Sequence, residues 1–288
     1  MLGVLLVGKP LGITSHDVVN QLRRKFSMKR IGHAGTLDPL ATGLLVVAIG
    51  PATRFLQYLP LEPKEYIAEI RFGIETASFD REGDVVRESQ VPDTIAEDVA
   101  AQLPMLTGLI QQIPPMYSAV KMKGQPLYKL ARSGKEVERE PRTVHIGAFE
   151  ILSRDSKEVF RARIECSGGT YIRTLAHDLG RLVGCGAHLS SLTRTRVGNF
   201  SLQQANSLAD CRADDLIPLG EAIAPMPKLT LDGDQVRAVR EGRPIYGAET
   251  LDAKLIALAE PDGNVFSVAR VAGNLLQPEC VIPSEARL

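Results

Sequence analysis

The loop that decides how this chain is interpreted reads Gly32-His33-Ala34-Gly35-Thr36-Leu37-Asp38-Pro39-Leu40-Ala41-Thr42-Gly43. Between Ile31 and Thr53, Asp38 is the only formally charged side chain. Pro39 favours an extended backbone at Asp38, and the glycines allow another backbone or a ligand to approach. A carboxylate in an apolar loop needs a partner, because burial without one raises its pKa. The spacing leaves two interpretations open, a turn aspartate bonded to its own loop or a functional carboxylate.

Predicted strands and a helix flank this loop. Residues 2–7 and 44–49 are apolar runs typical of buried strands, and residues 66–72 alternate as a half-buried strand does. Thr14-Ser15 is expected to cap a helix. The apolar stripe of that helix consists of Val18, Val19, Leu22 and Phe26.

Farther along, a strand over residues 159–166 precedes the clearest helix, Tyr171 to Val183. Arg173 lies near the N-terminus of that helix, where a cation is mildly disfavoured. This placement suggests an acidic partner for Arg173, the alternative being a surface arginine on a polar face shared with His177. Residues 95–110 are also predicted to be helical, with an interruption at Pro104, and residues 127–132 form a short helix.

Length and composition limit the class of protein. The chain has 34 basic and 34 acidic residues, a composition typical of an ordinary globular protein. Its length of 288 residues predicts one large domain and a small one. Neither a signal peptide nor a membrane-spanning segment is expected. The four cysteines are scattered without a C-x-x-C pair, so we expect reduced thiols and a cytoplasmic location.

The net charge of zero hides a segregated distribution. Residues 21–30 contain five basic side chains and no acid, and residues 121–142 contain seven basic side chains against three glutamates. Residues 75–98 contain eight acids and two arginines. Such segregation can present a basic face to phosphates, or it can reflect an ordinary solvated helix beside an acidic loop.

Three apparent motifs do not hold. Residues 3–9 match the start of a phosphate-binding loop, but Pro10 stands where a magnesium ligand is needed. Ser118 and Lys121 have the spacing of acyl-serine enzymes without the accompanying motifs. Cys185 and His188 have no second ligand pair nearby, so no metal site is expected.

The loop around Asp38 resembles the catalytic motif of the TruB family of tRNA pseudouridine-55 synthases. The resemblance extends over nearly the whole chain, and its motifs occur in the family's order. They are Lys9-Pro10 with Gly12-Ile13-Thr14-Ser15, Lys64-Glu65-Tyr66, Pro115-Met116-Tyr117-Ser118-Ala119, Cys166 to Leu175 with Asp178-Leu179-Gly180, and Gly184 to Leu189. It implies an α+β pseudouridine synthase fold with a large, mainly antiparallel sheet and a small C-terminal β-barrel-like PUA-type domain.

The resemblance assigns roles to six residues. Asp38 would be the catalytic carboxylate, which attacks the target nucleotide or abstracts a ribose proton. Tyr66 would be a second catalytic residue, which stacks on the flipped uracil and helps with proton transfer, and the third, Arg173, would pair with Asp38. Tyr171 and Leu192 would line the base pocket. His33, in the loop before Asp38, would fill the space that the uridine leaves in the RNA.

The resemblance also implies domains and partners. Residues 1–226 would form the catalytic domain, with an insertion at about 113–145 that clamps the T arm of tRNA, and residues 227–288 the PUA-like domain. Residues 232–288 hold nine acids against six bases, which argues against strong phosphate binding there. The reaction would need no cofactor or guide RNA, and the protein is expected to be a monomer.

Two alternatives stay open. One is a tRNA-folding chaperone that needs no catalysis, and the other is a pseudouridine synthase that acts on another RNA. A hydrolase with Asp38 as its nucleophile is disfavoured, because the surrounding loop has no metal-binding acids.

Overall fold

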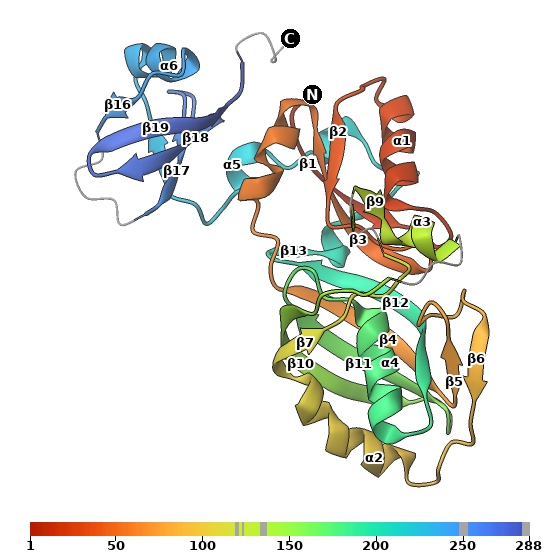
Figure 1. Ribbon diagram of the computed structural model, residues 1–288. Coiled ribbons are helices and arrows are strands. Elements are labelled where there is room, and N and C mark those ends of the chain that lie inside the picture. Colours follow the sequence, from red (N-terminus) through yellow and green to blue (C-terminus); the bar gives the residue numbers. More distant parts are fainter. Residues whose placement is uncertain (119–120, 123, 133–136, 248–252, 284–288) are drawn as a thin grey trace. The chain divides into compact units, whose positions relative to one another are not determined.

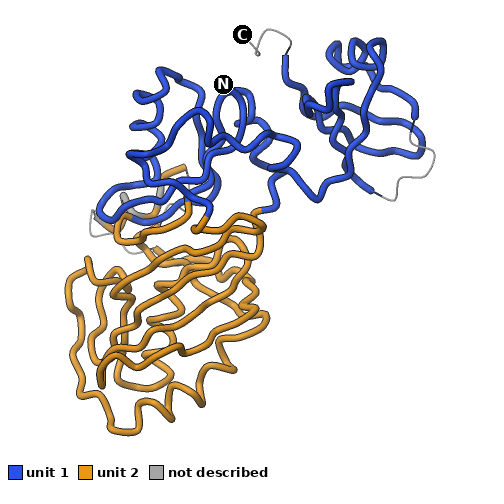
Figure 2. The backbone as a smooth tube through the Cα atoms, turned by 180° about the vertical axis from the view of Figure 1, so that it is seen from behind, with its two compact units in different colours: residues 1–38, 45–60, 204–288 blue, residues 39–44, 61–203 orange. Residues whose placement is uncertain are grey.

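The computed structural model describes residues 1–118, 121–122, 124–132, 137–247 and 253–283 (Figure 1). The chain divides into two compact units (Figure 2). Unit 1 comprises residues 1–38, 45–60 and 204–288, and unit 2 comprises residues 39–44 and 61–203. The boundary at residue 226 stays a prediction. Within the expected insertion at 113–145, residues 119–120, 123 and 133–136 lie outside the described part.

Unit 1 contains a sheet covered by helix α1 (Ser15–Lys25). Its strands are β14 (Asn206–Ser207), β1 (Gly3–Lys9), the last five residues of β3 (Ala41–Ile49) and β2 (Ile31–Ala34). Helix α1 packs here because its apolar stripe meets the apolar face of β1 and β3; the cluster includes Val18, Val19, Leu22, Leu5, Val7, Leu45 and Val47. Thr14 and Asp17 form the capping box that starts the helix.

The segment around His33 is more regular than its sequence suggests. Residues 32–43 were expected to be a loop, but β2 begins at Ile31 and β3 begins at Ala41. The four residues of β2 pair antiparallel with Val46 to Ile49. Strand formation here depends on this partner, because the glycine and the alanine of β2 have little β-propensity of their own. The loop is therefore shorter than expected.

Unit 1 also contains a second, five-stranded sheet. Its order is β15 (Lys228–Thr230), β17 (Leu255–Ala259), β18 (Val265–Ala272), β19 (Leu275–Val281) and β16 (Ile245–Tyr246). Helix α6 (Gly233–Arg240) starts at a cap formed by Asp232, and short helices α5 (Leu219–Ala222) and η4 (Ala213–Asp215) precede the sheet. The local apolar pattern predicts short strands at residues 229–231, 255–258 and 265–271 and a helix at residues 235–240, and the structure confirms all four. Strand β19 was missed because Gln277, Pro278 and Glu279 interrupt its apolar pattern.

Unit 2 contains the larger sheet. Its order is the first four residues of β3, β12 (Ala187–Val197), β4 (Lys64–Phe72), β11 (Val159–Cys166), β10 (Arg142–Arg154) and β7 (Gly108–Gln112). These pairs are antiparallel except β3 with β12. The expected large, mainly antiparallel sheet of an α+β fold is confirmed.

Smaller elements complete the two units. In unit 2 they are α2 (Ile95–Gln102), α3 (Leu127–Arg132), α4 (Ile172–Val183), β5 (Ile74–Thr76), β6 (Val85–Glu88), β8 (Lys121–Met122), β9 (Gln125–Pro126), β13 (Phe200–Ser201) and η2 (Leu103–Leu106). The 3-10 helix η3 (Leu202–Gln204) begins in unit 2, and its last residue belongs to unit 1. A further 3-10 helix, η1 (Gly50–Tyr58), lies in unit 1. None of the helices described is both long and apolar enough to cross a membrane.

The helix expected over residues 95–110 is wrong in its second half. Helix α2 ends at Gln102, a 3-10 turn contains Pro104, and residues 108–112 are strand β7. Proline removes a helical hydrogen bond and ends the helix. Strand β7 then forms because β10 offers an antiparallel edge.

Helix α4 lies unusually close to the sheet at Gly180. A Cβ atom at this position would lie 2.1 Å from the backbone nitrogen of Ala187, at the start of β12. Gly184, in the left-handed region, ends the helix, and the N–H of Gly186 donates to the carbonyl of Gly180. The chain can therefore pass from α4 to β12 only if residue 180 has no side chain.

We expect Gly180→Ala to lower the free energy of unfolding by about 3 kcal/mol, because the overlap is with backbone. The better helix propensity of alanine returns only about 1 kcal/mol. Equilibrium urea unfolding measures the change. Gly233→Ala is the matched control, because a Cβ there meets nothing within 4 Å; equal losses in both variants would contradict the explanation.

Candidate active site

The six residues predicted from the sequence fall into two groups. His33 and Asp38 belong to unit 1, whereas Tyr66, Tyr171, Arg173 and Leu192 belong to unit 2. Each group is described within its own unit.

The backbone before Asp38 is fixed by one buried hydroxyl. Ser15 Oγ accepts from the Leu37 N–H at 2.8 Å and donates to the Leu37 carbonyl at 3.1 Å. Ser15 is the first residue of α1, so the helix and the Asp38 loop are held together at this point. Asp38 itself is half-buried. The sequence placed Ser15 in a helix cap and in a family motif but did not indicate this contact with Leu37.

A buried lysine shapes the turn that leads into the same helix. Lys9 is 2% exposed, and its Nζ donates to the carbonyls of Ile13 at 2.6 Å and Pro10 at 2.9 Å. A buried ammonium needs such acceptors. Lys9 therefore holds the turn that places Thr14 and Ser15 at the start of α1.

His33 lies on strand β2 and not in a loop, which corrects the expectation. It pairs with Val47 on β3 and is half-buried. A residue on a paired strand has a fixed direction, because the side chains of a strand alternate between its two faces.

Tyr66 and Leu192 lie on one face of the unit 2 sheet. Leu192 pairs with Ala68, two residues from Tyr66, and Tyr66 pairs with Arg194. Residues directly opposite in a sheet point to the same face, as do residues two apart on one strand. Tyr66 and Leu192 are each only 7% exposed. The structure therefore brings these two predicted residues onto a common buried face.

Arg194 also belongs to this face, and sequence reasoning missed it. The side chain is 1% exposed, and its Nε donates to the Leu44 carbonyl at 2.8 Å. At residue 43 a Cβ would lie 2.3 Å from the Arg194 carbonyl oxygen, so only glycine permits this strand contact. The alternation of β12 could have indicated an inward arginine, but polar residues around it hide the pattern.

Charged and hydrogen-bonding neighbours surround the two side chains before Tyr66, which are Lys64 and Glu65. Burial lowers the pKa of Lys64, and the nearby Arg194 guanidinium lowers it further. Burial by itself would raise the pKa of Glu65, but hydrogen bonds from Thr195 at 2.7 Å and Arg163 at 3.1 Å reverse this and lower it. These contacts fix the register of β4 against β11 and β12.

Arg173 is buried, so the surface alternative is wrong. Its side chain is 5% exposed and forms an ion pair of 3.1 Å with Asp80, which is equally buried. The guanidinium also donates to the carbonyls of Ser78 at 3.1 Å and Tyr117 at 2.8 Å. The expected acidic partner exists, but the sequence did not identify Asp80. Pairing of Arg173 with Asp38 stays a prediction.

Asp80 is itself held by its own loop. One carboxylate oxygen accepts from the Ser78 hydroxyl at 2.6 Å and from the Glu82 N–H at 3.0 Å, and the other faces Arg173. The Thr76 hydroxyl donates to the Asp80 carbonyl at 2.6 Å. A buried carboxylate with this many donors is preorganised to hold one guanidinium geometry.

Tyr171 is placed by a buried amide that no sequence pattern indicated. Gln112, at the end of β7, accepts from the Tyr171 N–H at 2.7 Å and donates to its carbonyl at 3.1 Å. The Arg142 guanidinium lies 5.6 Å from the centre of the Tyr171 ring. Tyr171 caps α4, so Gln112 fixes the helix two residues before Arg173.

One helical turn after Arg173, His177 stacks on Phe79 with ring centres 3.9 Å apart. Phe79 adopts a left-handed backbone, with φ of 66°. Burial lowers the pKa of His177, which favours the neutral ring. Burial also raises the pKa of the neighbouring Asp178 to about 6, and Arg181 opposes this shift.

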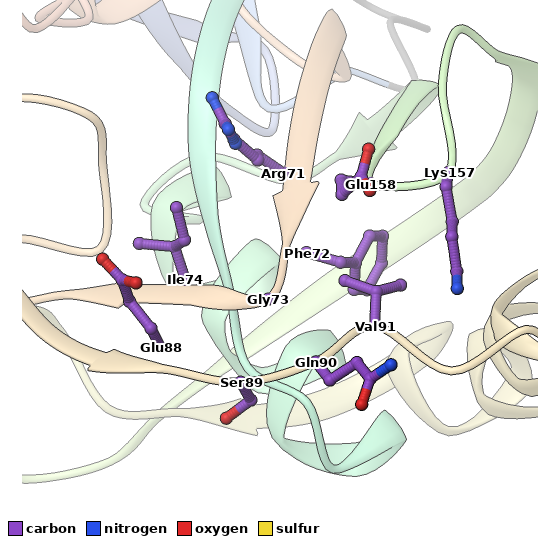
Figure 3. Close-up of a pocket in the computed structure, with 10 residues that line it drawn as sticks. All are labelled: Arg71, Phe72, Gly73, Ile74, Glu88, Ser89, Gln90, Val91, Lys157 and Glu158. Atoms are coloured by element: carbon purple, nitrogen blue, oxygen red, sulfur yellow. The ribbon is translucent and has the colours of Figure 1, made fainter.

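A hollow of about 600 Å³ at the other end of β4 is not this site (Figure 3). Figure 3 shows Phe72 and Val91 at its centre, with Lys157 and Glu158 to one side and Glu88 to the other. Lys157 is already paired with Asp93 at 2.5 Å. Among the residues described in the structure, no cluster of three or more His, Cys, Asp or Glu side chains could hold a metal ion.

Comparison with known families gives two matches along the chain. Residues 23–172 match the N-terminal domain of the TruB family pseudouridylate synthases. Residues 173–229 match the C-terminal domain of tRNA pseudouridylate synthase B.

Individual proteins show the same similarity. A tRNA pseudouridine synthase B of Dehalococcoides mccartyi is 46% identical, over 96% of this chain and 92% of that protein. One of Opitutus terrae is 49% identical, over 78% of this chain and 92% of that protein. A crystal structure of a Cbf5-Nop10-Gar1 complex matches with a TM-score of 0.72 and 26% identity, over 99% of this chain and 86% of that chain.

We expect Asp80→Asn to lower the free energy of unfolding by about 3 kcal/mol, because it removes the anion from a buried pair. Thermal or urea unfolding measures the change. The control is Asp155→Asn, since the pair of Asp155 with Arg161 is about half exposed and should contribute less than about 1 kcal/mol. Similar losses in both variants would contradict the assignment.

Asp178→Asn should stabilise the protein only at higher pH. The folded-state pKa is about 6, against an ordinary value of 3.8, so ionisation weakens the fold as pH rises through this range. Below about pH 4 the carboxyl is protonated in both states and the penalty is absent. Above about pH 6 the variant should be about 1–2 kcal/mol more stable, a value reduced for partial solvent exposure. A gain of equal size at all pH values would contradict this origin.

Proposed function

The chain belongs to the TruB family of pseudouridylate synthases, and from this premise we propose that it acts on the T arm of tRNA, at the T-loop uridine of position 55. It is an isomerase that converts a uridine of tRNA to pseudouridine. The observation that carries the proposal is the 46% identity to a tRNA pseudouridine synthase B over 96% of the chain.

The chemistry demands few groups but exact placement. The bond from N1 of uracil to C1′ of the ribose breaks, a bond from C5 to C1′ forms, and the hydrogen on C5 leaves as a proton while N1 gains one. In the proposed mechanism Asp38 either attacks the nucleotide or abstracts a ribose proton. The atoms and electrons balance within the substrate, so the site needs only to bind and orient the uridine and to move protons.

We assign Arg173 to stabilise the catalytic carboxylate. A guanidinium beside a carboxylate keeps it ionised in a dry pocket, where burial would otherwise favour the protonated form. Support comes from the anchoring of Arg173 by Asp80 and by two carbonyls. An arginine held at three points loses little freedom when a further carboxylate or a substrate arrives.

Tyr66, Tyr171, Leu192 and His33 are proposed to handle the base. Extruding a nucleotide costs a few kcal/mol, and an aromatic platform returns about 1–3 kcal/mol per stacked base. Tyr66 would be that platform, with Tyr171 and Leu192 lining the pocket. His33 would fill the vacated space in the RNA, as wedge residues do. The shared buried face of Tyr66 and Leu192 supports this assignment.

Segments outside the site are proposed to hold the tRNA. The segment at about 113–145 would clamp the T arm, and residues 227–288 would act as a PUA-like RNA-binding domain. The protein would work as a monomer in the cytoplasm, without guide RNA. The five-stranded sheet of residues 228–281 supports a separate module, although its acidic composition argues against a strong contribution to binding.

The first test is tritium release from tRNA labelled at uracil C5. Wild type should release tritium from one T-loop uridine without added guide RNA. Asp38→Asn should lower the rate by about 10³-fold or more, because the reacting group is removed. Binding of tRNA should change little, since its contacts are spread over a wide surface.

Tyr66→Phe is the comparison variant, because it keeps the stacking ring and removes only the hydroxyl. No release by a folded wild type that binds tRNA would favour the chaperone alternative. Release mapped to another RNA would favour the alternative substrate. Equal loss of binding and rate in Asp38→Asn would contradict the role given to Asp38.

A further inference from the structure

The basic stretch of residues 21–30 contains five cations and no acid, and the site described above does not use it. We call Arg23, Arg24, Lys25, Lys29 and Arg30 the basic cluster. All five lie in unit 1, at the end of α1 and in the turn that leads to β2 (Figure 1).

The fold gathers these side chains at one place. Helix α1 ends at Lys25, and Ser27 adopts a left-handed backbone with φ of 50°. The Met28 N–H then donates to the Arg23 carbonyl at 3.0 Å, which closes the turn. The chain therefore reverses at Ser27, and Lys29 and Arg30 follow directly beside the last turn of α1. Four of the five side chains are exposed, all but Arg23.

None of the five cations has a carboxylate partner within the residues that the structure describes. Arg23 donates to the Asn20 side chain and the Ile31 carbonyl, Lys25 to the Ala209 carbonyl, and Arg30 to the Thr53 hydroxyl, all neutral acceptors. Elsewhere in the described part, ten cations form ion pairs with carboxylates, while some other cations do not: the ten are Arg87, Lys157, Arg161, Arg163, Arg173, Arg196, Arg237, Arg240, Arg243 and Arg270. The cluster thus carries uncompensated positive charge.

The surface at the cluster is hollowed on both sides of Arg24. One hollow of about 380 Å³ is lined by Arg23, Arg24, Ser27, Met28 and Lys29. A second, of about 270 Å³, is lined by Gln21, Arg24, Lys25, Leu208 and Ala209. Cations around shallow hollows suit phosphate oxygens, which protrude from a nucleic-acid backbone.

The cluster is connected rigidly to the Asp38 loop. Arg30 and His33 are three positions apart in extended chain, about 10 Å at strand spacing. At the other end of α1, Ser15 binds Leu37, and Ser15 and Lys25 are ten positions apart, about 15 Å along the helix. A phosphate bound here would therefore lie within a few nucleotides of a base that reaches Asp38.

The ordinary explanation for basic residues at a helix C-terminus is the helix dipole. It accounts for Arg23, Arg24 and Lys25 in the last turn. It does not account for Lys29 and Arg30, which lie beyond the helix, or for the lack of any acid in ten residues.

We propose that the basic cluster binds backbone phosphates of the tRNA, a few nucleotides from the reacting uridine. This inference rests on the proposed function. Arg24 and Lys29 would make the direct contacts, since both side chains are exposed and neither side chain forms a hydrogen bond or ion pair with the residues that the structure describes. Arg23 and Arg30 would mainly hold the turn through Ile31 and Thr53.

The test is the variant Arg24→Gln/Lys29→Gln. Each lost phosphate contact should reduce the slope of log affinity against log salt by about 0.7–0.9, so two contacts reduce it by about 1.4–1.8. This corresponds to binding about 25- to 60-fold weaker at 0.1 M salt. The KM for tRNA should rise accordingly, while kcat at saturating tRNA stays unchanged, because neither residue touches the base.

The measurement compares full-length tRNA and an isolated T-arm hairpin between about 0.05 and 0.2 M salt. Arg161→Gln is the control, because this exposed arginine is already paired with Asp155; its KM and salt slope should match wild type. An unchanged salt slope in the double variant would overturn the proposal. A loss of affinity for full-length tRNA without a loss for the T-arm hairpin would also overturn it, because the proposed phosphates lie a few nucleotides from the reacting uridine. Failure of the proposed function is recognised separately, as wild type that forms no pseudouridine.

Discussion

The buried ion pair between Arg173 and Asp80 is the constraint on which the unit 2 site depends. A guanidinium and a carboxylate that are each 5% exposed tolerate little displacement, because either one alone would be an uncompensated buried charge. The elements that carry them are therefore held in place together. Asp80 ties the loop after β5 to α4, and the Tyr117 carbonyl ties the chain after β7 to the same guanidinium. Gln112 adds a second tie at the start of the helix.

Two close backbone contacts, both at glycines, also position strand β12. Gly180 lets α4 touch the start of β12, and Gly43 lets β3 lie against Arg194. In both places the contact is with backbone, which cannot move aside as a flexible side chain can. Strand β12 is thus fixed on one side by the helix and on another by β3, and it presents Leu192 and Arg194 on the face shared with Tyr66. In unit 1, Ser15 has a comparable role beside Leu37.

The ion pairing of individual cations says more about the charge distribution of this protein than its net charge does. Equal numbers of acids and bases give zero net charge, yet most arginines outside residues 21–30 that form contacts do so with carboxylates. Within the described part of the chain, the cations of residues 23–30 form hydrogen bonds only with neutral acceptors or form none. A long-range attraction to a polyanion depends on such local excess and not on the total.

The sequence by itself determined the elements with strong local patterns, and it identified the family. The capped helix at Ser15, the strand at 159–166 and the helix after Tyr171 follow from periodicity and capping, which need only neighbouring residues. Catalytic candidates such as Asp38 and Arg173 were recognisable because a charge stood where local rules disfavour one. The tertiary structure alone decided that His33 lies on a strand, that residues 142–154 and 187–197 form the long strands β10 and β12, and that Asp80 is the buried partner of Arg173. These features depend on hydrogen-bond and charge partners far away in the chain. Arg173 and Asp80 are 93 residues apart, so only the fold could select Asp80 from the eight acids of residues 75–98 as the partner of Arg173.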